Sequence, residues 1–263
     1  MKIGVCEKDL PGTLEENLEF IAKNGFDGFQ VWPDKVKDTN ELLRQCSELG
    51  IVVSAIGGGP NLVSSAERGK TIDAFRMRFD LAKELGCFIV TAETKEKPAE
   101  MSEDEAWESC TENIRAICAC AEKTGGALAI EPSGSCFVKD AEDWLELARR
   151  VNSRALKVNY DPANIVWAGK NPAEGVRILG SNIIHTHAKD IVFDRKAGYS
   201  EGTSNLVVHD VPAGKGKVGY KSYVQALKDA GYDGFLTIEM HHKNTEEILE
   251  SKEFLENLIG GKK

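Results

Sequence analysis

The chain has 263 residues, of which 41% are hydrophobic and 29% charged, and its formal net charge is -9 at pH 7. This composition is ordinary for a soluble globular enzyme, and the acidic balance opposes nucleic-acid binding, which needs a cationic surface. The length fits two small domains or one α/β barrel.

The N-terminal sequence and the cysteines predict a cytoplasmic protein. The first residues, M-K-I-G-V-C, lack the long apolar region of a signal peptide, and no apolar run is long enough to span a bilayer. The seven cysteines are an odd number without the spacing of a disulfide framework, which indicates reduced thiols, and we interpret Cys118 and Cys120, on a predicted helix, as packing residues. We therefore expect neither a membrane nor a nucleic acid as a partner, and assembly into a homo-oligomer stays open.

Short apolar runs alternate with longer helical patterns, which indicates parallel strands joined by crossover helices. The expected strands are 3–6, 28–32, 51–56, 87–92, 128–131, 156–161, the segment that begins at 183, and 235–240. The expected helices are 13–25, 40–50, 71–86, 102–125, one from about 140, one from 171, 220–231 and 244–259. Thr13 with Glu16 and Ser102 with Glu105 have the spacing of capping boxes.

A repeated junction of helix, glycine and strand organises the chain. K-N-G-F-D-G-F (23–29) and D-A-G-Y-D-G-F (229–235) are near copies, and E-L-G occurs at 48–50 and 84–86. A glycine just past a helix end adopts the left-handed conformation at little cost, so each junction marks a short return to the next strand. Eight such units without a linker predict one α/β domain over 1–263, a (β/α)8 TIM barrel. An open doubly wound sheet is the alternative, and it would leave two strand edges exposed.

Four neighbouring strands are expected to end in residues that can bind a metal. They are Glu131, Asp161, His187 and Glu239, and function in such barrels is found at the C-terminal ends of the strands. His185 and His187 lie on the same side of their strand because side chains alternate with period two. We interpret His185 as a hydrogen-bonded core residue and His187 as the residue at the rim.

The donor set indicates the metal and its chemistry. Three carboxylates and one imidazole suit Mn²⁺, Mg²⁺ or Co²⁺ better than a structural zinc held by thiols. Such an ion, chelating a carbonyl and the neighbouring hydroxyl, would acidify the intervening C–H and stabilise an enediolate. Two carboxylates on opposite faces could then remove and return a proton.

The motifs around these residues resemble a known family. E-P after the fifth strand, N-Y-D-P after the sixth, H-T-H-A-K-D in the seventh and T-I-E in the eighth are similar to the xylose-isomerase-like sugar-phosphate isomerase/epimerase family. Its members include ketose 3-epimerases, hydroxypyruvate isomerases, inosose dehydratases and dehydroshikimate dehydratases. The resemblance implies that all four residues bind the metal and that Glu131 and Glu239 transfer protons. The ketose epimerases have a histidine three residues after the aspartate, where this chain has Asn164.

Further candidates for substrate contact follow from their positions. Lys189 could hold a substrate oxygen or balance charge near the metal, or it could be a surface lysine paired with Asp190. Glu93, at the end of the fourth strand, could bind a sugar hydroxyl. Asn164 and His185 complete the set of polar candidates.

Aromatic and histidine side chains near the rim are weaker candidates. Trp32 and Trp167 could stack on a sugar or pack under a lid. His241 shares strand parity with Glu239, whereas His242 is expected to point away.

The segment 191–219 is long for a connection between strand and helix, so we expect a lid, centred on 196–210. It contains G-K-G-K-V-G (214–219), which matches the dinucleotide fingerprint. Too little chain remains after it for the second half of a dinucleotide-binding sheet. We therefore interpret the glycines as the turn into the next helix.

The function predicted from the sequence is a metal-dependent isomerase or epimerase acting on a ketose or related polyol. The alternative is a lyase, in which the same enolate expels a β-substituent. A metal-dependent repair enzyme for abasic DNA would need more histidines and a basic face. A sugar-binding protein without catalysis is the remaining possibility.

Overall fold

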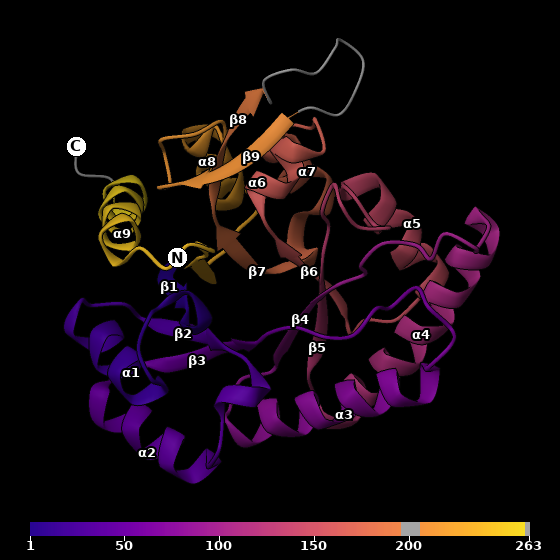
Figure 1. Ribbon diagram of the computed structural model, residues 1–263, viewed down its shortest axis with the longest axis horizontal. Coiled ribbons are helices and arrows are strands. Elements are labelled where there is room, and N and C mark those ends of the chain that lie inside the picture. Colours follow the sequence, from indigo (N-terminus) through magenta and orange to yellow (C-terminus); the bar gives the residue numbers. More distant parts are fainter. Residues whose placement is uncertain (196–205, 261–263) are drawn as a thin grey trace.

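The computed structural model describes residues 1–195 and 206–260, and it is a closed barrel of parallel strands surrounded by helices (Figure 1). Each strand pairs with its sequence neighbour and β10 closes the ring against β1. The barrel strands are β1 (Lys2–Cys6), β2 (Gly28–Val31), β3 (Val52–Ile56), β4 (Ile89–Glu93), β5 (Ala127–Glu131), β6 (Leu156–Tyr160), β7 (Ile183–Ala188) and β10 (Phe235–Ile238). The predicted (β/α)8 barrel is confirmed, and the open sheet is wrong.

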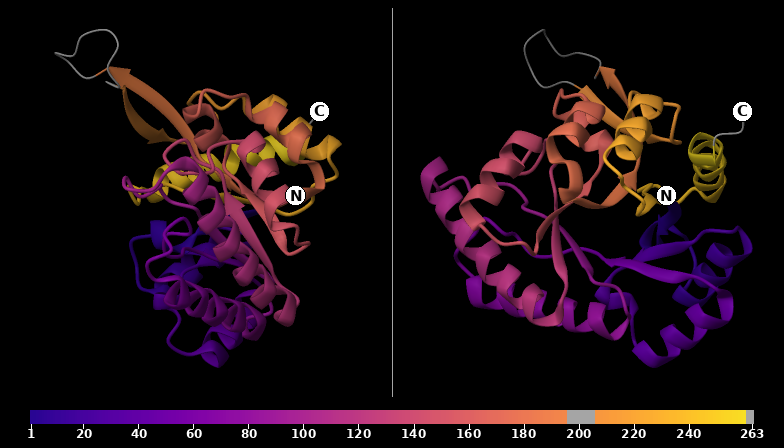
Figure 2. Two further views of the ribbon diagram at one scale, coloured as in Figure 1. Left: turned by 90° about the vertical axis from the view of Figure 1, so that its right-hand side faces the viewer. Right: turned by 180° about the vertical axis from the view of Figure 1, so that it is seen from behind.

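The helices lie on the outside of the ring of strands (Figures 1 and 2). They are α1 (Leu14–Lys23), α2 (Thr39–Leu49), α3 (Arg68–Glu84), α4 (Glu103–Thr124), α5 (Ala141–Val151), α6 (Pro162–Trp167), α7 (Pro172–Leu179), α8 (Tyr220–Asp229) and α9 (Thr245–Gly260). Both predicted capping boxes are present, at Thr13 and at Ser102. The short helix α6 was not predicted; Asp161 caps it and Pro162 is its first residue. None of the helices in the described part of the chain could cross a membrane.

The core is apolar between the helices and the strands, and it contains polar side chains inside the ring of strands. Large side chains such as Phe29, Phe75 and Trp144 are fully buried where helices cover the strands. Inside the ring, by contrast, Gln30 and Asn159 are buried and polar. Buried polar groups need hydrogen-bond partners, so these polar side chains inside the barrel can support the residues of a site.

The connection after β7 contains an antiparallel ribbon, whose two strands the sequence analysis did not predict. Strands β8 (Asp190–Arg195) and β9 (Leu206–Val211) pair along their whole length. The ribbon projects beyond the helices (Figure 2). Its runs I-V-F and L-V-V are rich in β-branched residues and have a strand propensity that the sequence analysis overlooked, and the expectation of a lid stays a prediction. Residues 196–205, which include much of the predicted lid, lie outside the described residues.

A buried carboxylate organises the turn between β9 and α8. Asp190 is fully buried, and its two oxygens accept hydrogen bonds of 2.9–3.0 Å from the backbone N–H groups of Gly214, Gly216 and Val218. A Cβ at Gly216 would lie 2.2 Å from Asp190 Oδ1, so only glycine fits there. The G-K-G-K-V-G segment is therefore a turn around Asp190 that leads into α8, which confirms the rejection of the dinucleotide motif.

Candidate metal and substrate site

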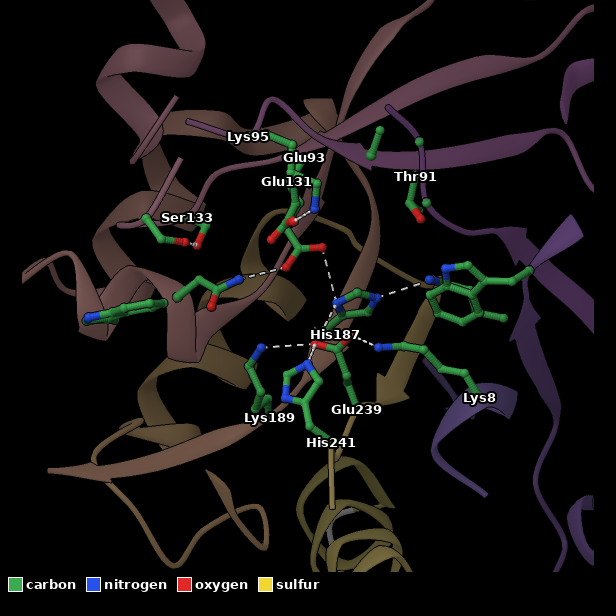
Figure 3. A pocket seen from close by; sticks show the side chains of 18 residues that line it. Lys8, Thr91, Glu93, Lys95, Glu131, Ser133, His187, Lys189, Glu239 and His241 are labelled. Atoms are coloured by element: carbon green, nitrogen blue, oxygen red, sulfur yellow. Dashed lines mark hydrogen bonds and ion pairs between the residues drawn. The ribbon is translucent and has the colours of Figure 1, made fainter. Parts of the chain in front are cut away.

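A pocket of about 350 Å³ opens at the C-terminal end of the barrel (Figure 3). Three of the four predicted metal ligands line it, namely Glu131, His187 and Glu239, and Asp161 is fully buried beside them. The ligand atoms of all four side chains lie within 4.8 Å of one another, and all four are buried. The structure thus brings together every metal ligand that the sequence predicted.

Glu131 is the last residue of β5, and two asparagines hold its carboxylate. Asn164 Nδ2 donates to Oε1 at 2.7 Å and Asn159 Nδ2 donates to Oε2 at 2.6 Å. The ring nitrogen Nδ1 of His187 is 3.3 Å from Oε2. Asn164 is therefore a neighbour of the proposed ligand as well as a residue of the pocket lining.

Asp161 follows β6 directly, and its two carboxylate oxygens have different partners. Oδ1 accepts hydrogen bonds from the backbone N–H groups of Ala163 and Asn164, at 2.8 and 3.3 Å, and so caps α6. Oδ2 lies 2.8 Å from the ammonium group of Lys189. The cap fixes the carboxylate, because a helix N-terminus favours a negative charge.

Glu239 follows β10 directly and is flanked by two lysines. Lys189 Nζ lies 2.9 Å from Oε2, and Lys8 Nζ lies 3.1 Å from Oε1. Lys189 is buried and contacts two carboxylates of the cluster, so the interpretation of it as a surface lysine paired with Asp190 is wrong. Asp190 is engaged with the backbone turn instead.

The ring of His187 gives an independent test of whether a cation fits. Nε2 lies 3.2 Å from Gln30 Oε1, which can accept a hydrogen bond from an N–H at Nε2. Nδ1 faces Glu131 and Glu239 at 3.3 and 3.6 Å, and it has no hydrogen-bond partner among the described residues. Burial opposes a charge on the ring, but the two carboxylates outweigh it and hold the pKa of His187 well above its usual value, so a positive charge is favoured at this position, either as a proton on the ring or as a divalent ion. The donor set therefore fits a divalent metal ion.

The two glutamates have different electrostatic surroundings. Burial raises the pKa of Glu131. Burial acts in the same direction on Glu239, but the charges of Lys189, His187 and Lys8 outweigh it and hold the pKa of Glu239 well below its usual range. Carboxylates in unlike environments can serve as proton donor and proton acceptor.

Two more of the predicted substrate contacts lie where the sequence placed them. Trp32 and Glu93 both line the pocket. Glu93 forms an ion pair with Lys95, which also lines the pocket and has a left-handed backbone conformation with φ of 65°. This conformation is unusual for a residue other than glycine and is typical of functional sites.

His185 is the exception, because it does not line the pocket. Its Nδ1 lies 2.9 Å from Asn159 Oδ1 and its Nε2 lies 3.1 Å from Thr237 Oγ1. Burial lowers its pKa well below the usual value. The structure thus supports the core interpretation of His185, and its position away from the pocket lining gives no support to its inclusion among the substrate contacts.

The weaker candidates divide as their positions predicted. Trp167 is 46% exposed and lines the pocket, as does His241. His241 Nδ1 lies 2.6 Å from Asp210 Oδ2, which comes from the ribbon strand β9. His242 points elsewhere, toward Glu247.

Several polar residues of the site were missed in the sequence. Gln30 and Asn159 could have been found as single polar residues inside apolar strands, and Asn159 is two residues from Asp161, on the same side of the strand. Lys8 and Lys95 lie two residues past the ends of β1 and β4, so a search of the residues just after the strand ends would have suggested them too.

The chain is similar in sequence and in structure to known proteins. A family model described as the xylose isomerase-like TIM barrel matches residues 18–258. The inosose dehydratase of Geobacillus thermodenitrificans is 21% identical over 262 residues, which cover 90% of this chain and 87% of the relative. The fructoselysine 3-epimerase of Escherichia coli O157:H7 is 26% identical over 250 residues, covering 86% and 85%. The crystal structure of the IOLI protein with a bound zinc atom superposes with a TM-score of 0.83 at 21% identity, covering 99% of both chains.

Proposed function

Since this chain belongs to the xylose isomerase-like TIM barrel family, we propose that it is a metal-dependent enzyme that isomerises or epimerises a ketose or related polyol. One observation carries the proposal. Four side chains from four neighbouring strand ends bring three carboxylates and one imidazole within 4.8 Å of one another. The relatives named as an epimerase and a dehydratase support a small carbohydrate as the substrate.

Glu131, Asp161, His187 and Glu239 would hold the ion. The carboxylate-rich donor set suits Mn²⁺, Mg²⁺ or Co²⁺, and the zinc atom bound to IOLI adds Zn²⁺ to the ions to be tested. A bound divalent ion would polarise the substrate carbonyl and stabilise the negative charge that develops when the neighbouring C–H loses its proton.

Glu131 and Glu239 are the proposed proton-transfer pair. The ring of His187 lies between them, with Nδ1 3.3 Å from one carboxylate and 3.6 Å from the other. A substrate in the pocket would meet one glutamate on each side. One glutamate would take the proton next to the carbonyl, and the other would return a proton to the resulting enediolate.

A lyase is the second candidate, and a contact at the mouth of the pocket favours it. Expulsion of a hydroxyl as water requires an acid near the leaving group. His241 lines the pocket, and Asp210 fixes its Nδ1 at 2.6 Å, so that Nε2 lies 3.8 Å from Glu239 Oε2. The relative named as an inosose dehydratase agrees with this alternative.

An NMR screen in D₂O would test the proposal and distinguish the candidates. Ketoses, inososes and their phosphates would be incubated with metal-free protein and with Mg²⁺-loaded or Zn²⁺-loaded protein. An isomerase or epimerase gives an isomeric product with solvent deuterium next to the carbonyl, whereas a lyase gives an unsaturated product. Turnover that is unchanged by complete removal of metal would refute metal dependence. The cytoplasm remains our proposed location, because seven cysteines without the spacing of a disulfide framework fit reduced thiols.

A further inference from the structure

All six carboxylate oxygens of Glu131, Asp161 and Glu239 already have a donor or cation from this chain. Two asparagine amides serve Glu131, and two backbone N–H groups serve Asp161 Oδ1. The three remaining oxygens are served by lysine ammonium groups. Every carboxylate oxygen of the cluster therefore has a partner from the protein itself, and the two lysines partly balance the charge of the three carboxylates.

Lys189 contributes most to this balance because it joins two of the carboxylates. Its ammonium group lies 2.8 Å from Asp161 Oδ2 and 2.9 Å from Glu239 Oε2, and only 7% of its side chain is exposed. The residue directly follows β7, whose neighbours in the barrel are β6 and β10, the strands that carry these two carboxylates. The strand order of the barrel thus places Lys189 between the two carboxylates, and its side chain is buried there rather than free at the surface.

Lys8 provides a natural comparison. It contacts the same Glu239, but through the other oxygen, Oε1, at 3.1 Å. Its side chain is 29% exposed and its ammonium group lies 4.9 Å from the ring centre of Trp32. Lys8 therefore adds positive charge near the cluster without occupying the space between two proposed ligands.

We propose that Lys189 is a built-in counter-ion that stabilises the metal-free site and competes with the divalent ion for Asp161 and Glu239. This inference rests on the proposed function, in which both carboxylates are metal ligands. Buried carboxylates without a cation destabilise a fold strongly, so an ammonium group between them protects the empty barrel. The same ammonium group repels an incoming divalent ion, because two like charges in a poorly screened site interact strongly.

The alternative role for Lys189 predicts the opposite effect. Residues that hydrogen-bond to metal ligands commonly orient them, and their removal weakens metal binding about 10- to 100-fold. A counter-ion that competes with the metal should instead weaken binding while it is present. The sign of the change in metal affinity upon removal of Lys189 therefore separates competition from orientation.

The test uses Lys189→Met, which keeps most of the side-chain volume and removes the charge, with Lys8→Met as the matched control. Mn²⁺ affinity would be measured by isothermal titration calorimetry, and thermal unfolding would be followed by circular dichroism with and without Mn²⁺. We expect Lys189→Met to bind Mn²⁺ at least about tenfold more tightly than the wild type, to melt several degrees lower without metal, and to gain more from Mn²⁺. Lys8→Met should bind within about threefold of the wild type, because its charge is better screened.

Each other outcome has a defined meaning. Weaker or unchanged Mn²⁺ binding by Lys189→Met, with normal binding by the wild type, would overturn the counter-ion role alone. A wild type that binds no divalent ion would overturn the proposed function as well. If metal-free Lys189→Met does not fold, recovery of the fold on refolding with Mn²⁺ supports the proposal, and failure to recover contradicts it.

Discussion

The two histidines of β7 have different surroundings although a single residue separates them. Both ring nitrogens of His185 have polar neighbours from the barrel interior, Asn159 and Thr237. His187 instead directs Nδ1 at Glu131 and Glu239. Strand periodicity brings both rings to the inside of the barrel, and only their height along the strand separates a core residue from a candidate ligand.

Loss of each histidine should therefore affect metal binding differently. We expect His187→Ala to weaken Mn²⁺ binding by about 100-fold or more, because it removes a ligand. We expect His185→Ala to weaken it by about tenfold or less, because it acts only through Asn159. Calorimetric titration of both variants gives the comparison. Equal losses would show that the metal ligand was assigned to the wrong histidine.

The proposed proton-transfer pair makes a second prediction at the same scale. Glu131→Gln and Glu239→Gln should each lower kcat by about 10²- to 10⁴-fold or more, because an amide cannot accept the proton. The rate would be measured on the substrate that the NMR screen identifies, together with deuterium incorporation from D₂O. Product formed at the wild-type rate without deuterium would indicate a hydride shift between carbons and would remove this role from both residues.

At the scale of elements, the barrel positions the site through strand ends and the turns that follow them. The turn after β9 is held by Asp190, which accepts hydrogen bonds from three backbone N–H groups of residues 214–218. This turn leads into α8, and the ribbon that precedes it supplies Asp210 to His241. Asp190 thus supports the wall of the pocket from behind, without lining it.

A glycine substitution in this turn should be costly. A Cβ at Gly216 would meet Asp190 Oδ1 at 2.2 Å and the Ile191 carbonyl oxygen at 2.5 Å. We expect Gly216→Ala to lower the free energy of unfolding by about 1–3 kcal/mol, as overpacking in an interior does. The control is Gly69→Ala in α3, where an added Cβ would have no neighbouring atom within 4 Å. This substitution should be neutral or stabilising. Urea denaturation of both variants measures the difference, and equal effects would contradict the role assigned to the turn.

At the scale of the whole molecule, burial controls the chemistry of the thiols. All seven cysteines are unpaired and buried. Burial raises the pKa of Cys110 and of Cys118 to about 12, and that of Cys46 to about 11. A thiol whose pKa is raised is protonated at neutral pH, and the protonated form is a poor nucleophile.

The native protein should accordingly resist thiol reagents. At pH 8 we expect Ellman's reagent to modify the native cysteines slowly, and to modify all seven rapidly once the protein is unfolded in guanidinium chloride. The absorbance of the released thionitrobenzoate measures both rates. Rapid modification of several cysteines in the native protein would contradict the packing shown here.

The sequence predicted those features that depend on local rules. Period-two alternation, helix caps and terminal glycines were sufficient for the barrel, and Glu131, Asp161, His187 and Glu239 followed because strand ends of a barrel share one rim. Features that depend on which side chains meet across the rim were missed. Lys8 reaches Glu239 only because β10 closes the ring beside β1.

Burial of charge was equally hard to predict from sequence. Lys189 and Asp190 are adjacent and of opposite charge, so a surface pair could not be distinguished in the sequence from a lysine that balances charge near the metal. In the structure they point to different partners, Lys189 to the carboxylate cluster and Asp190 to the backbone turn. Which partner a charged side chain finds depends on contacts distant in sequence, and the sequence pattern does not encode these.

The central claim is that Glu131, Asp161, His187 and Glu239 together hold one divalent ion. Crystals soaked in MnCl₂ and measured at the manganese absorption edge would test it most directly. We predict a single strong anomalous peak between these four side chains, and its loss in His187→Ala. A map without a peak in the pocket, or with a peak that none of the four side chains contacts, would contradict the account.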